Sequence, residues 1–353
     1  MNHLQTGIEK ITDIKVDSTV FDEAGEIIRK GGLVAFPTET VYGLGANGFD
    51  ADACAKIYEA KGRPSDNPLI LHVADRAMID KAATVTEMAE RVLAAFAPGP
   101  VTVILPKRDE VPSSVTGGLT TVGVRMPDND IARALIRAAG VPIAAPSANR
   151  SGRPSPTTAA AVFADMDGKI PLILDGGPCR FGVESTIVDC TGERAAILRP
   201  GAVTREMLAE VLGELAPPPV VGEKDAPLAP GMKYTHYAPL APLTLISASR
   251  KKKYEAFCAA VREATEKGKR PGVIVSRELA EELATLVPAR HIAVYGDAGD
   301  VPAMAANLYE SLRYFDDVDV DVLFADTIEE KGLGVAVMNR LKKAAGGRML
   351  FID

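Results

Sequence analysis

Apolar residues along the first 215 positions fall into two patterns, short buried runs and helical repeats. Apolar runs that predict strands lie at 33–36, 69–73, 101–105, 121–125, 142–145, 172–174 and 185–189. Apolar residues at helical spacing predict helices at 23–30, 52–60, 86–96, 130–139, 157–164 and 204–212. Gly31 and Gly32 stop the first helix, which places Pro37-Thr38-Glu39-Thr40 at the end of strand 33–36. This pattern predicts a large, mixed, twisted open α/β sheet.

Beyond residue 240 the pattern becomes a simple alternation of strands and helices. Strands are expected at 243–246, 273–275, 292–295 and 320–325, and helices at 253–267, 277–284, 303–315 and 335–345. We predict a small Rossmann-like domain with parallel strands, although no Gly-x-Gly-x-x-Gly motif supports a nucleotide site there. The proline-rich stretch from Pro217 to Gly231 marks the boundary. The predicted organisation is a catalytic domain over 1–215, a linker over 216–239 and a C-terminal domain over 240–353.

Composition narrows the partners that this chain can have. The 353 residues are 47% hydrophobic and 25% charged, with a net charge of −7, which argues against a nucleic-acid-binding surface over the whole molecule. The basic run 250–253 is either an RNA patch or the solvated first turn of a helix. No apolar run approaches the ~20 residues of a membrane span, and the N-terminus does not resemble a signal peptide, so we expect a cytoplasmic protein without membrane contact.

Cysteine and histidine spacing gives no sign of a metal site. The four cysteines and four histidines are scattered, and no Cys-x-x-Cys pair is present. Neither a disulfide framework nor a zinc site is indicated, and any metal is expected to arrive with a ligand.

Two polar loops have the composition of a polyphosphate site. Lys61-Gly62-Arg63 precedes an apolar strand, and Ser147-Ala148-Asn149 follows another, with Arg150 or Arg153 as further cations. Fixed cations beside backbone amides suit phosphate groups, and loops at strand ends can converge. Each loop alone also fits an ordinary solvated turn.

A second group of residues suits a small polar ligand. Thr38, Thr40 and Tyr42 lie on a glycine-flanked turn, which can instead be a structural turn with a buried tyrosine. Arg125 ends an apolar strand and requires an anionic partner if it is buried, either a substrate carboxylate or a structural aspartate. Asp175, Glu184 and Asp189 can hold magnesium, act as bases or cap local structure, and the sequence leaves them unassigned.

The motifs together resemble the two-domain form of the YrdC-type threonylcarbamoyl-AMP synthases, along nearly the whole chain. The resemblance rests on segments at 37–44, 61–63, 67–69, 124–127, 146–149, 184–187, 198–201 and 230–237. It implies a YrdC-like mixed sheet followed by the Rossmann-like domain. It also implies a nucleotidyltransferase that converts L-threonine, bicarbonate and ATP into threonylcarbamoyl-AMP and pyrophosphate, with Mg²⁺ bound through the ATP phosphates. The product serves a separate threonylcarbamoyl transferase complex that modifies tRNA beside the anticodon.

The same resemblance implies roles for individual residues. Lys61 and Arg63 are expected to stabilise the departing pyrophosphate as catalytic residues. ATP is expected to contact Lys61, Arg63, Asn67, Thr121, Ser147, Asn149, Ser155, Arg199 and Tyr234. L-Threonine is expected to contact Thr38, Thr40, His72, Arg125, Ala145 and Ser185. Tyr234 belongs to the linker segment, which the resemblance predicts to fold over the active site and exclude water.

Two other functions remain to be compared with this one. A double-stranded-RNA or ribosome-associated binding module would use a concave basic face, against which the pI of 5.4 weighs. A carbamoyl-transfer domain of a larger maturation enzyme would bring zinc-finger cysteines, and this chain has none at the required spacing.

Overall fold

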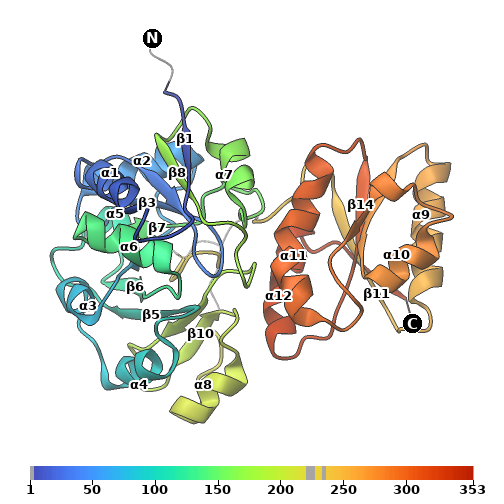
Figure 1. Ribbon diagram of the computed structural model, residues 1–353. Helices are drawn as coiled ribbons and strands as arrows, with labels where there is room; N and C mark the ends of the chain where they lie inside the picture. Colours follow the sequence, from blue (N-terminus) through green and yellow to red (C-terminus); the bar gives the residue numbers. More distant parts are fainter. Residues whose placement is uncertain (1–3, 220–226, 233–235, 353) are drawn as a thin grey trace. The chain divides into compact units, whose positions relative to one another are not determined.

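The computed structural model describes residues 4–219, 227–232 and 236–352, which form two compact units (Figure 1). The first unit comprises residues 1–151 and 155–234, and the second comprises residues 152–154 and 235–353. Among the described residues, no helix combines the length and apolar character needed to cross a bilayer.

The first unit is built on one mixed ten-stranded sheet. Its strands are β1 Gly7–Lys10, β2 Val34–Phe36, β3 Gly43–Asn47, β4 Ile70–His72, β5 Val101–Pro106, β6 Thr121–Arg125, β7 Ile143–Ala145, β8 Leu172–Asp175, β9 Thr186–Asp189 and β10 Ala196–Arg199. They lie in the order β1-β8-β2-β3-β7-β4-β6-β5-β9-β10. β4 and β6 run parallel, whereas β7 is antiparallel to β4. The carboxyl end of β7 therefore meets the amino ends of β4 and β6.

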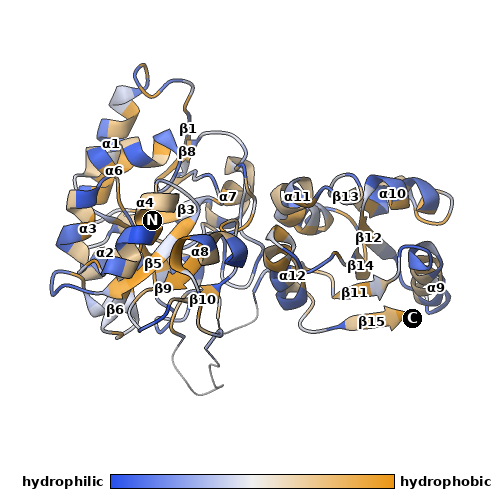
Figure 2. Ribbon diagram, turned by 90° about the horizontal axis from the view of Figure 1, so that it is seen from below, coloured by the Kyte–Doolittle hydropathy of each residue, from blue (hydrophilic) through white to orange (hydrophobic). Residues whose placement is uncertain are grey.

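Helices cover both faces of this sheet. They are α1 Ser18–Arg29, α2 Ala51–Lys61, α3 Arg76–Ala82, α4 Glu87–Phe96, α5 Ser113–Thr116, α6 Asp130–Ala139, α7 Ala159–Met166 and α8 Arg205–Leu212. Strand residues alternate between the faces. Ala35 and Ala144 pack with α2 and α7, whereas their neighbours Val34 and Ile143 pack with α1 and α6. Figure 2 shows the apolar character of the central strands against the polar outer positions of the helices.

The α1/α6 face of the sheet is where the site is built. Helices α1 and α6 pack over β2, β7 and β8 on this face. Farther along the same face, Ile70 of β4, Ile104 of β5 and Ile187 of β9 pack against Ala229 of the linker. The polar residues of β4 and β6 discussed below lie between these two apolar clusters.

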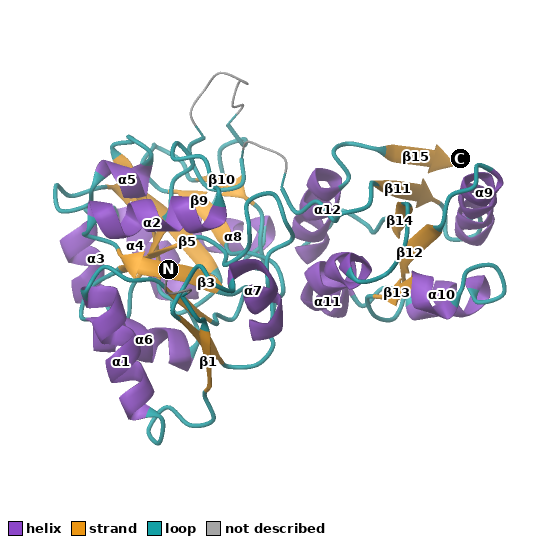
Figure 3. Cartoon of the chain, turned by 90° about the horizontal axis from the view of Figure 1, so that it is seen from above, coloured by secondary structure: helices purple, strands orange, loops and turns teal. Residues whose placement is uncertain are grey.

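The second unit is a five-stranded parallel sheet between helices. Its strands are β11 Leu243–Ala248, β12 Pro271–Val275, β13 Ile292–Val294, β14 Val322–Asp326 and β15 Met349–Ile352, in the order β13-β12-β14-β11-β15. Its α-helices are α9 Lys253–Glu266, α10 Arg277–Leu283, α11 Val301–Arg313 and α12 Leu333–Ala344, with short 3₁₀ turns at Ala289–His291 and Tyr314–Asp316. Helices α9 and α10 cover one face, and α11 and α12 cover the other (Figure 3).

The predicted fold class is confirmed, and most predicted elements form within one or two residues of their expected ends. The sequence patterns missed β1, β3, α3, α5, β10 and β15. β3 is the instructive case, because Gly43-Leu44-Gly45 looked like part of a turn. Its glycines lie under Phe36, where a Cβ on Gly45 would come within 2.9 Å of the ring.

Candidate active site

The parallel strands β4 and β6 carry residues of both the predicted threonine site and the predicted nucleotide site. On β4 and β6, His72 lies beside Arg125 at the carboxyl ends, and Ile70 pairs with Gly123. Ala145 of β7 pairs with Ile70. Thr121 begins β6, four residues before Arg125, so the two ends of this strand are about 13 Å apart. Arg125 and His72, two of the predicted threonine residues, thus lie at one end of these strands, and the predicted nucleotide residue Thr121 lies at the other end of β6.

Lys61 joins the two predicted phosphate loops. It is the last residue of α2, and Gly62 ends the helix in the left-handed conformation with φ 63°. The Lys61 ammonium donates 2.6 Å to the carbonyl of Ser147 and contacts the carbonyl of Asn149. The Lys61 side chain is only 4% exposed, so the alternative of a solvated turn is wrong for this residue.

Arg63 lies in the loop that connects α2 to β4. Its Nη2 donates 3.0 Å to the carbonyl of Pro68, and its Nε donates 3.3 Å to the carbonyl of Asn67. Asn67 is buried, and its side-chain Oδ1 receives no hydrogen bond from the described residues. The guanidinium therefore fixes the backbone that enters β4 at the amino end.

The loop after β7 is ordered by its own side chains. Ser147 Oγ donates 2.6 Å to Asn149 Oδ1, and Asn149 Nδ2 donates 2.8 Å to the carbonyl of Arg150. Arg150 is exposed, and its amide donates to the buried Asp165. Arg153 contacts Asp316 within the second unit, an alternative to the phosphate contact that the sequence suggested for it.

Ser155, Ser185 and Arg199 belong to a buried polar network. Ser155 Oγ donates 2.6 Å to Glu184 Oε1. Arg199 holds Ser185 at two points, with 3.1 Å from Nε to the carbonyl and 3.1 Å from Nη2 to Oγ. Gly201 permits this arrangement, because a Cβ there would come within 2.3 Å of the amide nitrogen of Thr186. The predicted ATP contact Arg199 is thereby hydrogen-bonded directly to the predicted threonine contact Ser185.

Thr38 and Thr40 form a closed turn after β2. Thr38 Oγ1 lies 2.8 Å from Thr40 Oγ1 and donates 2.7 Å to the carbonyl of Val41. Tyr42 is fully buried, and its hydroxyl donates 2.7 Å to the carbonyl of Gly177. Tyr42 is therefore the structural tyrosine of the two alternatives, while the threonines remain candidates for ligand contact.

Arg125 finds its counter-charge in a residue that the sequence did not single out. Arg125 Nη2 lies 2.7 Å from Glu39 Oε2, and the two side chains are 4% and 2% exposed. A buried arginine was expected to need an anion, and Glu39 between Thr38 and Thr40 meets that need. Thr102, which lies 2.8 Å from Ser185 Oγ, and Glu184 are further members of the site that received no role from the sequence.

His72 is a neutral imidazole in this site. Its Nδ1 lies 3.2 Å from the carbonyl of Ile70, which favours a proton on Nδ1 because a carbonyl only accepts. Burial, and then the neighbouring Arg125, lower the pKa of His72 to about 3. His72 is therefore uncharged at neutral pH.

The linker contacts the first unit within the described residues 227–232. Ala229 is fully buried among Ile70, Ile104, Ile187 and Leu198. Arg199 Nη1 donates 3.4 Å to the carbonyl of Pro230, and a narrow gap beside Thr121 is lined by Pro230 and Leu228. Tyr234 lies outside the described residues.

The unassigned carboxylates have local partners. Asp175 Oδ1 accepts from the amide of Gly177, and Asp189 Oδ1 accepts from the amide and hydroxyl of Thr191. Among the residues that the structure describes, no group of three or more His, Cys, Asp or Glu could hold a metal ion.

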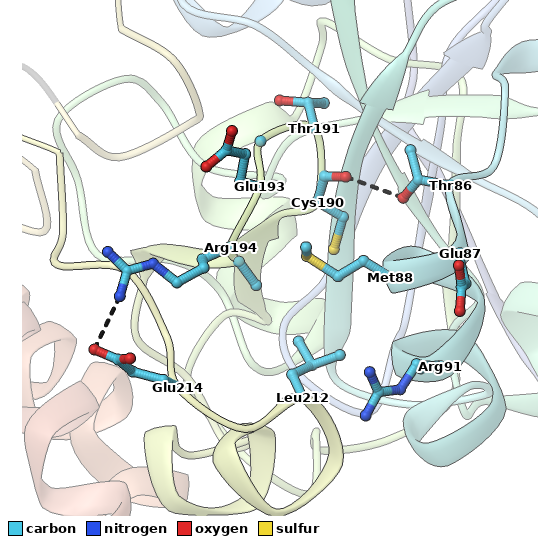
Figure 4. A pocket seen from close by; sticks show the side chains of 12 residues that line it. Thr86, Glu87, Met88, Arg91, Cys190, Thr191, Glu193, Arg194, Leu212 and Glu214 are labelled. Carbon is cyan, nitrogen blue, oxygen red and sulfur yellow. Dashed lines mark hydrogen bonds and ion pairs between the residues drawn. The ribbon is translucent and has the colours of Figure 1, made fainter.

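A separate surface cavity of about 400 Å³ lies between α4, α8 and the turn that joins β9 to β10 (Figure 4). Thr86 donates to the carbonyl of Cys190 at its rim, and Arg194 pairs with Glu214. None of the predicted ligand residues lines this cavity.

The architecture and this site define a two-domain protein of the Sua5/YrdC class, and two family models match it. The Sua5, YciO and YrdC model, described as telomere recombination, matches residues 26–201, and the model of the threonylcarbamoyl-AMP synthase C-terminal domain matches residues 203–346. Threonylcarbamoyl-AMP synthase from Bacillus subtilis is 44% identical over 97% of this chain and 98% of its own length. The Pyrococcus abyssi enzyme of the same name is 48% identical over 93% of this chain and 94% of its own length. The chain belongs to the threonylcarbamoyl-AMP synthase family.

Solved structures agree with this membership. The crystal structure of P. abyssi Sua5 complexed with L-threonine is 44% identical, covers 99% of both chains and superimposes with a TM-score of 0.91. Escherichia coli YciO, with 26% identity and a TM-score of 0.50, covers 55% of this chain.

Proposed function

We propose that this protein condenses L-threonine, bicarbonate and ATP into threonylcarbamoyl-AMP and pyrophosphate. The observation that carries the proposal is the separation of two polar groups along β4 and β6. Arg125 and His72 lie at one end of these strands, and Thr121 lies at the other end beside the Arg63–Asn67 loop. The span of about 13 Å suits an amino acid that must meet the α-phosphate of a nucleotide.

The chemistry requires positioning more than covalent catalysis. The threonine amine adds to carbon dioxide with loss of a proton, or to bicarbonate with loss of water. The resulting carbamate oxygen then attacks the α-phosphorus while pyrophosphate leaves. Arg125 is proposed to hold the threonine carboxylate, with Thr38, Thr40, His72, Ala145 and Ser185 around the amino acid. Holding both reactants in line and neutralising charge supplies most of the rate in such transfers.

The nucleotide is proposed to lie over the loops at the amino ends of β4 and β6. Asn67, Thr121, Ser147, Asn149, Ser155 and Arg199 are the proposed ATP contacts, with Tyr234 on the linker. Lys61 and Arg63 are proposed to stabilise the leaving pyrophosphate. Because each already donates to backbone carbonyls, their second role is to fix the loop geometry around the phosphates. Mg²⁺ is proposed to enter with the ATP phosphates, the usual way in which this cation reaches a phosphoryl-transfer site.

The linker is proposed to close over this site. The burial of Ala229 and the contact of Arg199 with Pro230 support a linker that stays on the first unit. A covered site would protect the carbamate and the adenylate from water. The labile product is proposed to pass to a separate transferase that modifies tRNA.

The test is pyrophosphate release from MgATP by the full chain, with threonine and bicarbonate added together or singly. We expect release only when both are present, and a nucleotide product with the mass of threonylcarbamoyl-AMP. Release that ignores threonine would contradict the proposal. A salt-sensitive complex with double-stranded RNA in the absence of ATP would instead support the binding-module alternative.

A further inference from the structure

Glu39 places a buried negative charge beside Arg125. The carboxylate lies 2.7 Å from the guanidinium, and both side chains are nearly inaccessible to water. Burying such a pair is costly, and replacing it with apolar residues is often neutral or stabilising. A structural role alone therefore gives a weak reason for charges at this position.

The position of Glu39 is fixed by its backbone. The Thr38 hydroxyl accepts from the amides of Thr40 and Val41, and the Glu39 carbonyl accepts 2.8 Å from the amide of Phe181. In the sheet order, β2 is separated from β6 by four strand spacings, about 19 Å. The turn after β2 must therefore extend over the sheet face to bring Glu39 to Arg125.

The pair has unused hydrogen-bonding capacity. Apart from the 2.7 Å ion pair between Arg125 Nη2 and Glu39 Oε2, Arg125 Nε finds no acceptor and Glu39 Oε1 finds no donor within the described part of the chain. Buried polar atoms normally have partners, and a missing partner destabilises the folded chain. The missing partners are an acceptor beside Arg125 and a donor beside Glu39.

An amino-acid zwitterion supplies both of these groups. Its carboxylate accepts from a guanidinium, and its ammonium donates up to three hydrogen bonds. We propose that Glu39 is a specificity-determining and positioning residue, which orients Arg125 toward the carboxylate of the amino acid and receives its ammonium group. This inference rests on the proposed function, because it assumes that an amino acid binds beside Arg125.

If Glu39 receives the ammonium group, the site should bind amino acids in preference to the corresponding hydroxy acids. A hydroxy acid with the carbon skeleton of threonine would satisfy Arg125 but offer Glu39 a neutral hydroxyl with a single donor in place of the charged ammonium. Sites built around such polar contacts discriminate against analogues that lack the group. Nearby His72 is neutral at pH 7, so it neither repels the ammonium nor replaces Glu39 as its counter-charge.

The experiment measures binding of L-threonine and of 2,3-dihydroxybutanoate, which lacks the amine, by calorimetry. We expect the wild-type chain to prefer threonine at least tenfold. Glu39→Gln should weaken threonine binding at least tenfold and abolish the preference, and Glu39→Asp should restore part of both. The Kd for ATP should change less than threefold in either variant. Glu23→Gln, on the exposed face of α1, is the matched control and should behave as the wild type.

The outcomes separate this inference from the proposed function. If the wild type binds no threonine and releases no pyrophosphate, both fail. If the wild type is active and Glu39→Gln keeps its preference for the amine, the positioning role alone is wrong. If both Glu39 variants lose threonine and ATP binding together with their thermal transition, Glu39 is a structural residue and the inference is overturned.

Discussion

The ammonium of Lys61 and the carbonyl of Ser147 are joined by a 2.6 Å hydrogen bond across 86 residues of sequence. This contact fastens the end of α2 to the loop that follows β7. It also brings a positive charge into a part of the site where water has little access, since Lys61 is 4% exposed. A buried ammonium has a strong effect on nearby phosphate charge because screening is weak there.

Replacing Lys61 should therefore affect folding as well as catalysis. A solvated loop cation, as the sequence suggested, would contribute little to stability, but the structure shows two carbonyls that depend on this ammonium. Lys61→Met should lower the free energy of unfolding by about 1–3 kcal/mol and reduce kcat/KM for ATP at least a hundredfold. Urea unfolding and pyrophosphate release measure the two effects.

The control for this prediction is Lys81→Met, on the exposed last turn of α3. It removes the same charge from the chain and should change neither quantity measurably. Full stability of Lys61→Met would show that Ser147 and Asn149 keep their carbonyls satisfied without the lysine.

The sequence predicted the architecture well because apolar periodicity reports burial directly. The large mixed sheet and the second, parallel domain followed from local apolar patterns, whereas the roles of the site residues come from the family resemblance and stay predictions. Glu39 was singled out by neither, because a glutamate between two threonines looks like an exposed turn residue. Its role depends on a contact with Arg125, 86 positions away, and no local pattern encodes that distance. β3 was missed for a similar reason, because its glycines are required by close packing against the ring of Phe36.

His72 should make stability depend on pH. The folded protein holds its pKa near 3, below the ordinary value of 6.5, so the unfolded chain binds a proton first as the pH falls. The contribution of His72 to the free energy of unfolding is fully present above pH 6.5. It is lost as the pH falls toward 3, at about 1.4 kcal/mol per pH unit. Between pH 6.5 and pH 5 the free energy of unfolding of the wild type should fall by about 2 kcal/mol more than that of His72→Asn. Urea unfolding at both pH values tests this, and identical losses in the two proteins would contradict it.

Arg199 should link the two substrates kinetically. Its guanidinium donates to both the carbonyl and the hydroxyl of Ser185, which a lysine cannot reproduce with its single nitrogen. Arg199→Lys should raise KM for threonine as well as for ATP, each by about tenfold, because Ser185 loses its orientation. Ser185→Ala should raise KM for threonine only. Steady-state kinetics with each substrate varied in turn distinguish these results, and an effect of Arg199→Lys on ATP alone would count against the link.

The linker prediction can be tested at Ala229. This residue is fully buried against Ile70, Ile104 and Leu198, so Ala229→Asp would place an unpaired carboxylate among apolar side chains. The segment should then detach from the first unit, raising KM for ATP several-fold and increasing the hydrolysis of the adenylate product to AMP. Leu240→Asp adds the same charge where the side chain is 66% exposed and should leave both unchanged. If Ala229→Asp retains wild-type coupling between pyrophosphate release and intact product, closure by residues 227–232 does not protect the intermediate.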